Sequence, residues 1–444
     1  MKTPIYDFVK KYSESGISRF HMPGHKGRGP LGCEPLDITE IFGADTLYAA
    51  DGIIEESEGY ASSLFGSAKS FYSTEGSTLA IRAMLAAALA RSKKNATRPL
   101  VLAARGAHKA FITAAALIDF DVEWINSTAA HIASCSVSAA DVRGALASGK
   151  KFDAVYLTSP DYLGNISPID EISAVCHEFS VPLLVDNAHG AYLAFLKPNQ
   201  HPIALGADMC CDSAHKTLPV LTGGAYLHLS ERAEKYITGA RASLSLFAST
   251  SPSYLILESL DLCNSYLADD YTQALADTVS KISAAKDSIR DRGLEVLITE
   301  PLKIVVSPRS FGYTGEELAG YLRERCVEVE FSDGDYTVLM ATPENSDTDF
   351  DRLTSAILAL PRRAPLEASS KIDIAAPKRA ASIREAMLSQ SELIPIDEAL
   401  GRVCAVPTVS CPPAVPIAVS GEIIDPRVIL LCKKYGIKNI EVMK

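Results

Sequence analysis

The stretch Met209-Cys210-Cys211-Asp212-Ser213-Ala214-His215-Lys216-Thr217 joins a short apolar run to a polar turn that carries a lysine. A short apolar run between helical stretches is typical of a strand buried in a parallel sheet. Ligands bind such sheets at the carboxyl ends of the strands, which is where this pattern places Lys216. Its amine could form an imine with an aldehyde cofactor if burial or nearby cations keep the amine neutral. The alternative is a solvated loop lysine.

Strand-like and helical segments alternate on both sides of this stretch. In chain order they are 77–91 (helix), 99–103 (strand), 154–158 (strand), 169–179 (helix), 182–185 (strand), 209–211 (strand) and 224–229 (strand). This alternation predicts an α/β fold with a mainly parallel central sheet covered by helices on both faces.

The pattern changes in the last third of the chain. A long helical pattern begins near Ser280, and a helix that opens at Thr314 has a capping residue followed by first-turn carboxylates. The strands expected here are 295–298, 303–306, 327–331 and 336–341. We therefore predict four segments: an irregular N-terminal arm (1–47), a large domain that holds the sheet (48–265), a smaller α+β domain (266–366) and a C-terminal domain or cap (367–444).

Composition narrows the class of protein. The 444 residues are 47% hydrophobic and 22% charged, and charges interrupt every apolar run well before the length of about 20 residues that a membrane span needs. The net charge of −11, without a block of Lys and Arg, argues against nucleic acid as a partner. The first residues, MKTPIYDFVKK, do not resemble a secretory signal, and the ten cysteines form no C-x-x-C pair. We expect a cytoplasmic protein with buried free thiols and a small-molecule partner.

Two further polar motifs accompany Lys216. Asp186 follows the apolar run 182–185, and a buried carboxylate there needs a cationic partner such as a protonated pyridine nitrogen; the alternative is a cap or turn residue. The run Gly76-Ser77-Thr78 opens a helix, where free N–H groups, hydroxyls and the helix dipole suit a phosphate; the alternative is simple capping. Together the three motifs match the needs of a phosphorylated pyridine aldehyde.

The order and the residues of these segments resemble the short form of the Orn/Lys/Arg decarboxylase family, which has the aspartate-aminotransferase-like fold. The resemblance covers most of the chain. The motifs that carry it are 20–27 (FHMPGHKG), 37–40 (DITE), 74–78 (TEGST), 106–109 (GAHK), 159–164 (SPDYLG), 185–190 (VDNAHG), 213–219 (SAHKTLP), 249–254 (STSPSY), 412–413 (PP) and 420–422 (SGE).

The resemblance implies a pyridoxal 5'-phosphate (PLP) enzyme that decarboxylates arginine, lysine or ornithine to an amine and CO₂, as in polyamine biosynthesis. It implies that Lys216 forms the Schiff base, that Asp186 pairs with the pyridine nitrogen, and that Lys216 or His215 reprotonates the substrate carbon. His108 would stack on one face of the ring and Ala188 would pack on the other, although His108 could instead be a satisfied loop histidine. The residues implied to hold the phosphate are Gly76, Ser77, Thr78 and Ser213, with His215 beside the Schiff base. Thr250 and Ser251 would reach the phosphate of a neighbouring subunit, which implies a homodimer with shared active sites.

Several positions depart from the family pattern. They are Asn187 (Glu expected), Tyr192 (His), Gly223 (Gln), Asp161 (Thr), Cys411 (Tyr) and Ala414 (Gly). These departures weaken any transfer of substrate identity. Asp161 could bind the distal cation of a substrate or cap a turn, and Glu422 and the 51–56 region could bind that cation or be solvated charges.

Two motifs are decoys, and two other function classes stay open. Residues 27–32 match G-x-G-x-x-G, but no strand precedes them and they contain a proline, so we reject a dinucleotide site. His21 and His25 have no evident third ligand, and we predict no metal. The other classes are a different PLP reaction, such as amino transfer, and a non-catalytic PLP-binding protein.

Overall fold

The computed structural model describes residues 1–90, 98–125, 131–367, 376–409 and 414–444. Of the predicted features, Arg91, Cys411 and the Pro412-Pro413 pair lie outside these residues. Contacts divide the chain into two compact units. The first unit comprises Met1–Leu102, Val142–Leu157 and Pro168–Thr272, and the second comprises Ala103–Asp141, Thr158–Ser167 and Gln273–Lys444.

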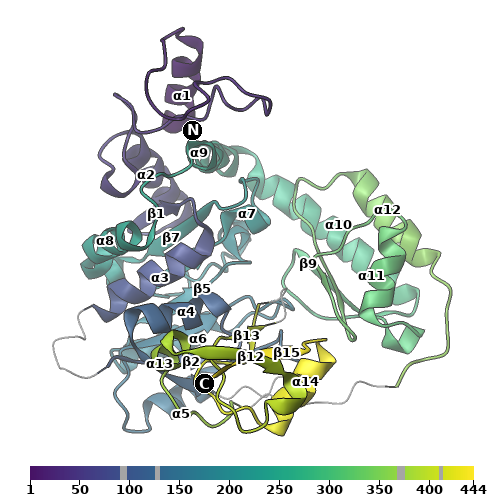
Figure 1. The fold of residues 1–444 in the computed structure, drawn as a ribbon. Helices are drawn as coiled ribbons and strands as arrows, with labels where there is room; N and C mark the ends of the chain where they lie inside the picture. The colour runs from purple at the N-terminus through teal and green to yellow at the C-terminus, as the bar shows by residue number, and fades with distance from the viewer. Residues whose placement is uncertain (91–97, 126–130, 368–375, 410–413) are drawn as a thin grey trace. The chain divides into compact units, whose positions relative to one another are not determined.

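A seven-stranded, mainly parallel sheet has the strand order β1-β7-β6-β5-β4-β2-β3 (Figure 1). The strands are β1 (Lys69–Ser73), β2 (Leu100–Ala104), β3 (Asp121–Ile125), β4 (Ala154–Thr158), β5 (Leu183–Asp186), β6 (Met209–Asp212) and β7 (Ala225–Leu229). β5 and β6 are parallel, whereas β7 is antiparallel to both β1 and β6. The predicted sheet is confirmed.

The central strands β5 and β6 are buried along their whole length. Strands covered on both faces are apolar at consecutive positions, which explains runs such as Leu183-Leu184-Val185. Each strand ends in an aspartate, Asp186 in β5 and Asp212 in β6. The polar residues of the predicted site therefore begin where the apolar runs stop.

Helices connect the strands. The described helices from the N-terminus to residue 291 are α1 (Pro4–Glu14), η1 (Leu47–Ala49), α2 (Ile53–Phe65), α3 (Gly76–Leu89), α4 (Lys109–Ile118), α5 (Ala139–Leu146), α6 (Ile169–Glu178), η3 (Ala191–Phe195), α7 (Ala214–Thr217), η4 (Glu231–Tyr236), α8 (Ile237–Phe247), α9 (Tyr254–Asp269) and α10 (Tyr271–Asp291). Helix α3 is apolar almost all round and is buried accordingly.

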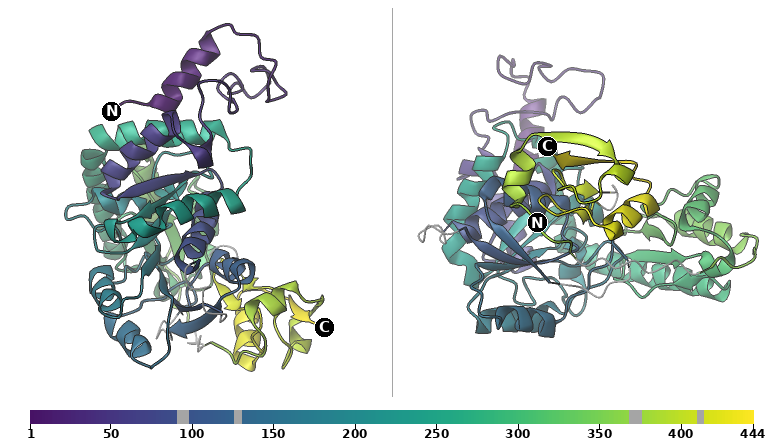
Figure 2. Two further views of the ribbon diagram at one scale, coloured as in Figure 1. Left: turned by 90° about the vertical axis from the view of Figure 1, so that its left-hand side faces the viewer. Right: turned by 60° about the horizontal axis from the view of Figure 1, so that its bottom comes forward.

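The N-terminal arm is less irregular than predicted, because it begins with helix α1. Ile5 and Val9 on this helix are fully buried. The backbone N–H groups of Ile5 and Tyr6 donate to Asp261 Oδ2 at 2.9 and 3.0 Å, so a carboxylate from α9 caps the helix. The left-hand view of Figure 2 shows α1 and the chain after it at one end of the first unit.

The second unit contains a four-stranded antiparallel sheet with the order β10-β11-β9-β8. Its elements are β8 (Glu295–Val296), β9 (Lys303–Ser307), η5 (Arg309–Phe311), α11 (Gly315–Arg323), β10 (Phe331–Ser332), β11 (Thr337–Met340) and α12 (Asp347–Leu358). The predicted cap at Thr314 is confirmed as a capping box with Glu317. The predicted strand 327–331 is wrong except for its last residue. Cys326 has a φ of 57°, and this left-handed residue turns the chain just after α11.

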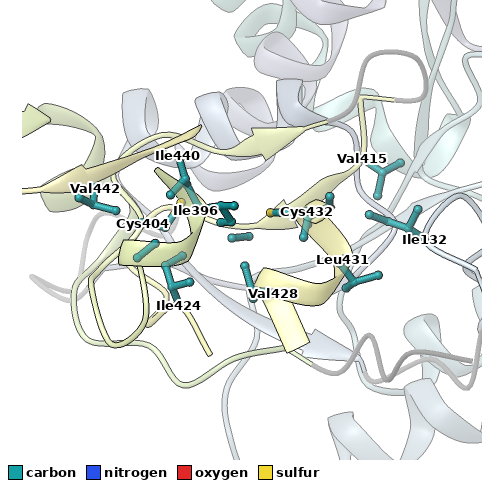
Figure 3. Packing of buried hydrophobic residues seen from close by; sticks show 13 residues of the cluster. Ile132, Ile396, Cys404, Val415, Ile424, Val428, Leu431, Cys432, Ile440 and Val442 are labelled. Carbon is teal, nitrogen blue, oxygen red and sulfur yellow. The ribbon is translucent and has the colours of Figure 1, made fainter. Parts of the chain in front are cut away.

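The C-terminal part of the second unit has its own apolar cluster, shown in Figure 3. Its elements are α13 (Ile383–Leu388), β12 (Ser391–Pro395), η6 (Ile396–Glu398), β13 (Thr408–Val409), β14 (Pro416–Ala418), α14 (Pro426–Lys434) and β15 (Asn439–Met443). Val428 and Leu431 of α14 pack in one cluster with Ile440 and Val442 of β15. The C-terminal segment therefore shares a core that also includes Ile132.

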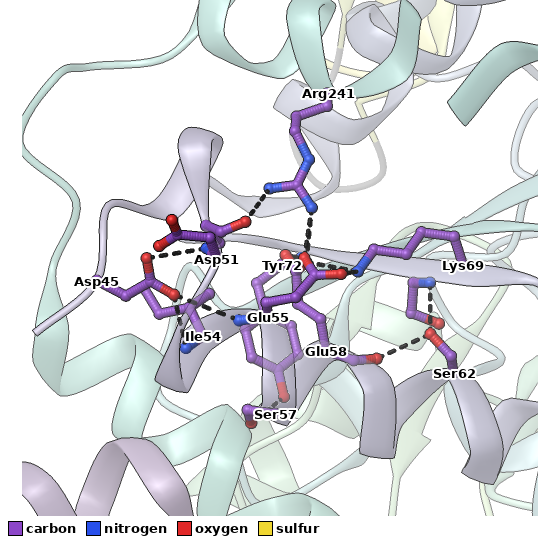
Figure 4. Close-up of polar contacts among 12 residues, drawn as sticks. Asp45, Asp51, Ile54, Glu55, Ser57, Glu58, Ser62, Lys69, Tyr72 and Arg241 are labelled. Atoms are coloured by element: carbon purple, nitrogen blue, oxygen red, sulfur yellow. Dashed lines mark hydrogen bonds and ion pairs between the residues drawn. The ribbon is translucent and has the colours of Figure 1, made fainter. Parts of the chain in front are cut away.

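A buried polar network surrounds the start of helix α2 (Figure 4). Asp45 Oδ2 accepts from the N–H groups of Gly52 and Ile54 at 2.9 and 3.0 Å, so Asp45 caps the helix. Glu55 pairs with Lys69 at 2.7 Å and with Arg241 at 2.6 Å. The 51–56 region was a candidate for binding a substrate cation, but in this structure its Glu55 carboxylate is bound to cations of the protein itself.

Glu58, in the same network, gives a prediction about stability. Burial raises the pKa of Glu58 to about 7 from an ordinary value of 4.5, although Lys69 and Arg241 oppose the shift. Between about pH 4.5 and pH 7, Glu58 is protonated in the folded protein but ionised in the unfolded chain. The free energy of unfolding therefore falls as pH rises through this range. Glu58→Gln removes this proton. We expect the variant to gain stability relative to wild type as pH rises, by up to about 1.4 kcal/mol per pH unit.

Urea unfolding at pH 5, 6 and 7 measures this difference. Glu56→Gln is the matched control, because Glu56 is exposed on the same helix. Equal pH dependence in wild type and Glu58→Gln would contradict a proton bound by Glu58 in the folded state.

Two general features complete the fold. Among the described helices, none combines the length and apolar character needed to cross a bilayer. The described cysteines carry free thiols, and all are buried except Cys33, which is half-buried, and Cys326, which is exposed. The expectation of buried thiols was therefore wrong for these two residues.

Candidate active site

Lys216 lies in α7, a single helical turn directly after β6. Buried Ser213 and Ala214 hold the start of this turn, and the Lys216 N–H donates to the Ser213 carbonyl at 3.0 Å. The lysine side chain is half-buried, and its Nζ lies 3.0 Å from His189 Nε2. The amine therefore lies at the carboxyl end of a core strand in contact with a titratable group.

Asp186 ends the neighbouring strand β5, opposite Cys211 of β6, and is only 2% exposed. Its carboxylate accepts from the Tyr156 hydroxyl at 3.1 Å, the Ala188 N–H at 3.3 Å and the Cys211 thiol at 3.7 Å. Burial raises the pKa of the Asp186 carboxyl, and the charge of Lys216 opposes this shift. A buried carboxylate held by neutral donors is suited to bind a cationic ring nitrogen.

A second buried carboxylate, Asp212, joins the ends of β5 and β6. Its Oδ1 accepts from Asn187 Nδ2 at 2.7 Å, and its Oδ2 lies 3.0 Å from His201 Nε2 and 3.3 Å from His228 Nε2. Burial alone would raise the pKa of Asp212, but the two histidines lower it overall. Because Asn187 follows Asp186 and Asp212 precedes the Lys216 turn, this network links the two segments of the site.

The predicted phosphate cradle lies at the start of α3. Ser213 Oγ donates to Ser77 Oγ at 2.8 Å, which brings two of the predicted phosphate ligands together. Gly76 has a φ of +70°, and its N–H donates to the Gly223 carbonyl at 2.7 Å. The N-cap residue Glu75 forms no side-chain capping bond among the described residues. The N-terminus of this helix is therefore not capped by the side chain of its N-cap residue, and two serine hydroxyls meet beside it.

The Glu75 side chain instead binds the Ser249 segment. Its Oε1 accepts from the Ser249 N–H at 2.7 Å, so Thr250 and Ser251 follow a residue tied to the cradle of their own chain. Both Thr250 and Ser251 are exposed. Their role at a neighbouring subunit's phosphate stays a prediction.

His108 belongs to the second unit, where it is the N-cap of α4. Its Nδ1 accepts from the Ala110 N–H at 3.1 Å, which places the proton of a neutral ring on Nε2. The ring is half-buried. The cap accounts for one ring nitrogen, and the predicted stacking role stays a prediction.

Asp161 and Glu422, the two low-ranked substrate candidates, also belong to the second unit and are buried among protein partners. Asp161 accepts from the N–H groups of Cys135 and Asn165, each at 2.9 Å, so it acts as a turn residue. Glu422 pairs with Arg105 at 2.9 Å. Burial raises the pKa of Glu422, and Arg105 opposes the shift. In this structure both carboxylates serve the fold.

His215 and His189 make different contacts near Lys216. His215 Nδ1 lies 2.9 Å from the Gly224 carbonyl oxygen, and burial lowers the pKa of this ring. The contact with Lys216 Nζ comes from His189. His189 stands three residues after Asp186, and that spacing from a strand-end aspartate was the available signal for it.

One departure from the family pattern has a clear physical reason. Gly223 has a φ of +103°, and a Cβ there would lie 2.9 Å from the Thr74 carbonyl oxygen. Glutamine, which the family pattern favours, would be strained in this conformation. Asn187 takes part in the Asp212 network, and Tyr192 is fully buried.

Comparisons with known proteins agree with this arrangement. The family model of the Orn/Lys/Arg decarboxylase major domain matches residues 3–307, and that of the Orn/Lys/Arg decarboxylase C-terminal domain matches residues 367–432. The arginine decarboxylase of Bacillus subtilis is 28% identical over 473 residues, covering 99% of this chain and 94% of that protein. The uncharacterized protein YaaO of the same organism is 30% identical over 364 residues, covering 77% and 74%.

Solved structures show the same fold. The constitutive lysine decarboxylase of E. coli has a TM-score of 0.79 at 17% identity and covers 100% of this chain and 82% of that chain. The lysine decarboxylase LdcF of Francisella novicida has a TM-score of 0.80 at 17% identity, with 100% and 81% covered. The predicted fold class is confirmed. The major-domain model matches more than half of this chain, and the chain therefore belongs to the Orn/Lys/Arg decarboxylase family.

Proposed function

We propose that this protein is a PLP-dependent decarboxylase of a basic amino acid, with Lys216 as the residue that binds the cofactor covalently. One observation carries the proposal: within the first unit, Lys216 and Asp186 follow adjacent parallel strands, beside a serine-lined helix N-terminus. The family relationship supports the same chemistry.

The residues present fit PLP on three counts. The buried Asp186 carboxylate is bonded by neutral donors, and a pyridinium nitrogen would supply the cationic partner that a buried carboxylate needs. Ser77 and Ser213 lie together at the N-terminus of α3, where Gly76 and Thr78 would complete the phosphate site. Lys216 supplies the amine, and Ala188, 8% exposed beside Asp186, supplies a small apolar surface for the ring.

When bound, PLP supplies an electron sink for the pair left on the substrate Cα as the carboxylate departs as CO₂. Asp186 would keep a proton on the ring nitrogen, and Tyr156 would hold the Asp186 carboxylate in place. Ala188 would pack against one face of the ring. Lys216 or His215 would deliver a proton to the substrate carbon after CO₂ has left.

The substrate is proposed to be arginine, lysine or ornithine. The test is a panel of these three and other amino acids with purified holoenzyme, in which CO₂ and the amine product are both measured. We expect equimolar CO₂ and amine from at least one basic amino acid. Transfer of the amino group without CO₂ would favour an aminotransferase, and no reaction with any member of the panel would favour a non-catalytic PLP-binding protein.

We also propose a homodimer with shared active sites. The N-terminal arm exposes large apolar side chains that water disfavours, which is typical of an interface. These residues, with their exposed fractions, are Ile17 (60%), Phe20 (98%), Leu31 (82%) and Phe42 (104%). Exposed Thr250 and Ser251 would contribute to the partner's phosphate site.

We also propose that the chain has the four predicted segments, 1–47, 48–265, 266–366 and 367–444, and that the second segment binds PLP. It also places the enzyme in the cytoplasm, because all nine described cysteines carry free thiols. The amine product is of the class used in polyamine biosynthesis.

A further inference from the structure

His189 lies in the turn after β5, is 5% exposed, and places its Nε2 atom 3.0 Å from Lys216 Nζ. We propose that His189 is the proton partner of Lys216, which accepts a proton from the lysine ammonium when the amine bonds to the cofactor. This inference rests on the proposed function and deepens it. The family resemblance assigned no role to His189.

The contact is anchored on both sides. On the His189 side, the Gly190 N–H donates to the Asn187 carbonyl at 2.8 Å and closes a tight turn. A Cβ on Gly190 would lie 2.0 Å from Asn187 Oδ1, so a larger residue there would displace the Asn187 side chain. On the Lys216 side, Asn187 Nδ2 is bonded to Asp212, which ends the strand before the Lys216 turn. The geometry of the His189–Lys216 contact is therefore fixed by the strand ends.

The chemistry requires a proton acceptor. A lysine ammonium has no lone pair, so it cannot attack a carbonyl carbon until it loses one proton. In the proposed step Lys216 gives that proton to His189 Nε2, and its lone pair forms a bond to the carbonyl carbon. The carbonyl oxygen leaves as water with the two remaining amine hydrogens, and His189 returns its proton to the nitrogen. No oxidation or reduction takes place, and the total charge is unchanged.

His215 has a backbone contact instead. Its Nδ1 lies 2.9 Å from the Gly224 carbonyl oxygen, which orients the ring by a backbone contact. His189 Nε2, by contrast, contacts the Lys216 amine. The inference therefore concerns His189 alone.

The test measures the rate of covalent PLP attachment to apoprotein as a function of pH, by visible absorbance and by borohydride trapping. We expect His189→Gln to attach PLP about 10- to 100-fold more slowly than wild type, within the range of general acid–base effects. Its pH profile should also lose the inflection due to the histidine. His177→Gln is the matched control, because His177 lies on α6 and is bonded to Asp208, and its loss should leave the rate unchanged.

Binding of 4'-deoxypyridoxine 5'-phosphate, which has no carbonyl group, separates a proton role from a structural one. We expect its affinity for His189→Gln to stay within about 3-fold of wild type, since the phosphate and ring contacts remain. We also expect free imidazole to accelerate attachment in His189→Ala. Equal attachment rates in wild type and His189→Gln would overturn the inference, as would an equal loss of analogue binding.

The same experiment distinguishes the two proposals. Absence of PLP attachment in wild type would contradict the proposed function itself. Attachment in wild type with an unaffected His189→Gln variant would contradict only the role of His189.

Discussion

Replacing Lys216 with alanine should abolish covalent PLP attachment and lower turnover by at least about 10²-fold, because the variant loses both the imine-forming amine and a proton donor. The visible absorption band of the protein-bound cofactor should disappear. Lys235→Ala is the matched control, because Lys235 is exposed in the same unit and should keep the band. Absorbance and CO₂ release measure the two effects.

The Lys216→Ala variant also separates covalent attachment of PLP from its non-covalent binding. Since PLP can still bind through its phosphate and ring nitrogen, Lys216→Ala should retain some non-covalent affinity. An unchanged visible spectrum in Lys216→Ala would place the covalent bond on another lysine.

Replacing Asp186 with alanine should weaken PLP binding by about 100-fold or more and remove most turnover. Removing one partner of a buried ion pair typically costs about 3–5 kcal/mol, and here the partner would be the pyridinium nitrogen. Cofactor affinity is measured by titration of apoprotein, and turnover by amine release. Asp170→Ala is a suitable control, because Asp170 is exposed on α6. Near-normal turnover in Asp186→Ala would refute the assigned role.

Much of the large sheet was predictable because its signals are local. The strand 154–158 was predicted with the bounds of β4. The run 182–185 is shifted by one residue from β5, and the run 209–211 ends one residue before β6 does. Fully buried strands are apolar at every position, so polar residues mark where they stop. The same rule placed Asp186 and Lys216 at strand ends.

Helix α1 was missed although its signals are present. Pro4 stands at its first turn, and Ile5, Phe8 and Val9 have helical spacing. The glycines and prolines farther along the arm outweighed them in the prediction. The cap itself, Asp261, lies more than 250 residues away in sequence, and no local pattern indicates such a contact.

The roles of Asp161 and Glu422 depend on partners that the sequence does not pair. The local sequence around a carboxylate does not show whether it binds a substrate or pairs with a protein residue such as Arg105. The His189–Lys216 contact is similar, since 27 positions separate the two residues and β5 and β6 bring them together. Strand-end motifs could be predicted, but the contacts between them required the structure.

The Asp212 network shows how the fold supports the site. Two histidines and Asn187 surround a carboxylate that has no exposure to solvent. A buried charge is stable only when it is paired and hydrogen-bonded, and here the pairing joins the segment of Asp186 to that of Lys216. This chain departs from the family pattern at position 187, and the asparagine found there provides the bond to Asp212.

The most direct test of the central claim is to reduce purified holoenzyme with sodium borohydride, digest it and locate the cofactor by peptide mass. The account predicts a single pyridoxyl-modified peptide in which the label is on Lys216. A label on any other lysine, or no labelled peptide from a protein that contains PLP, would contradict it.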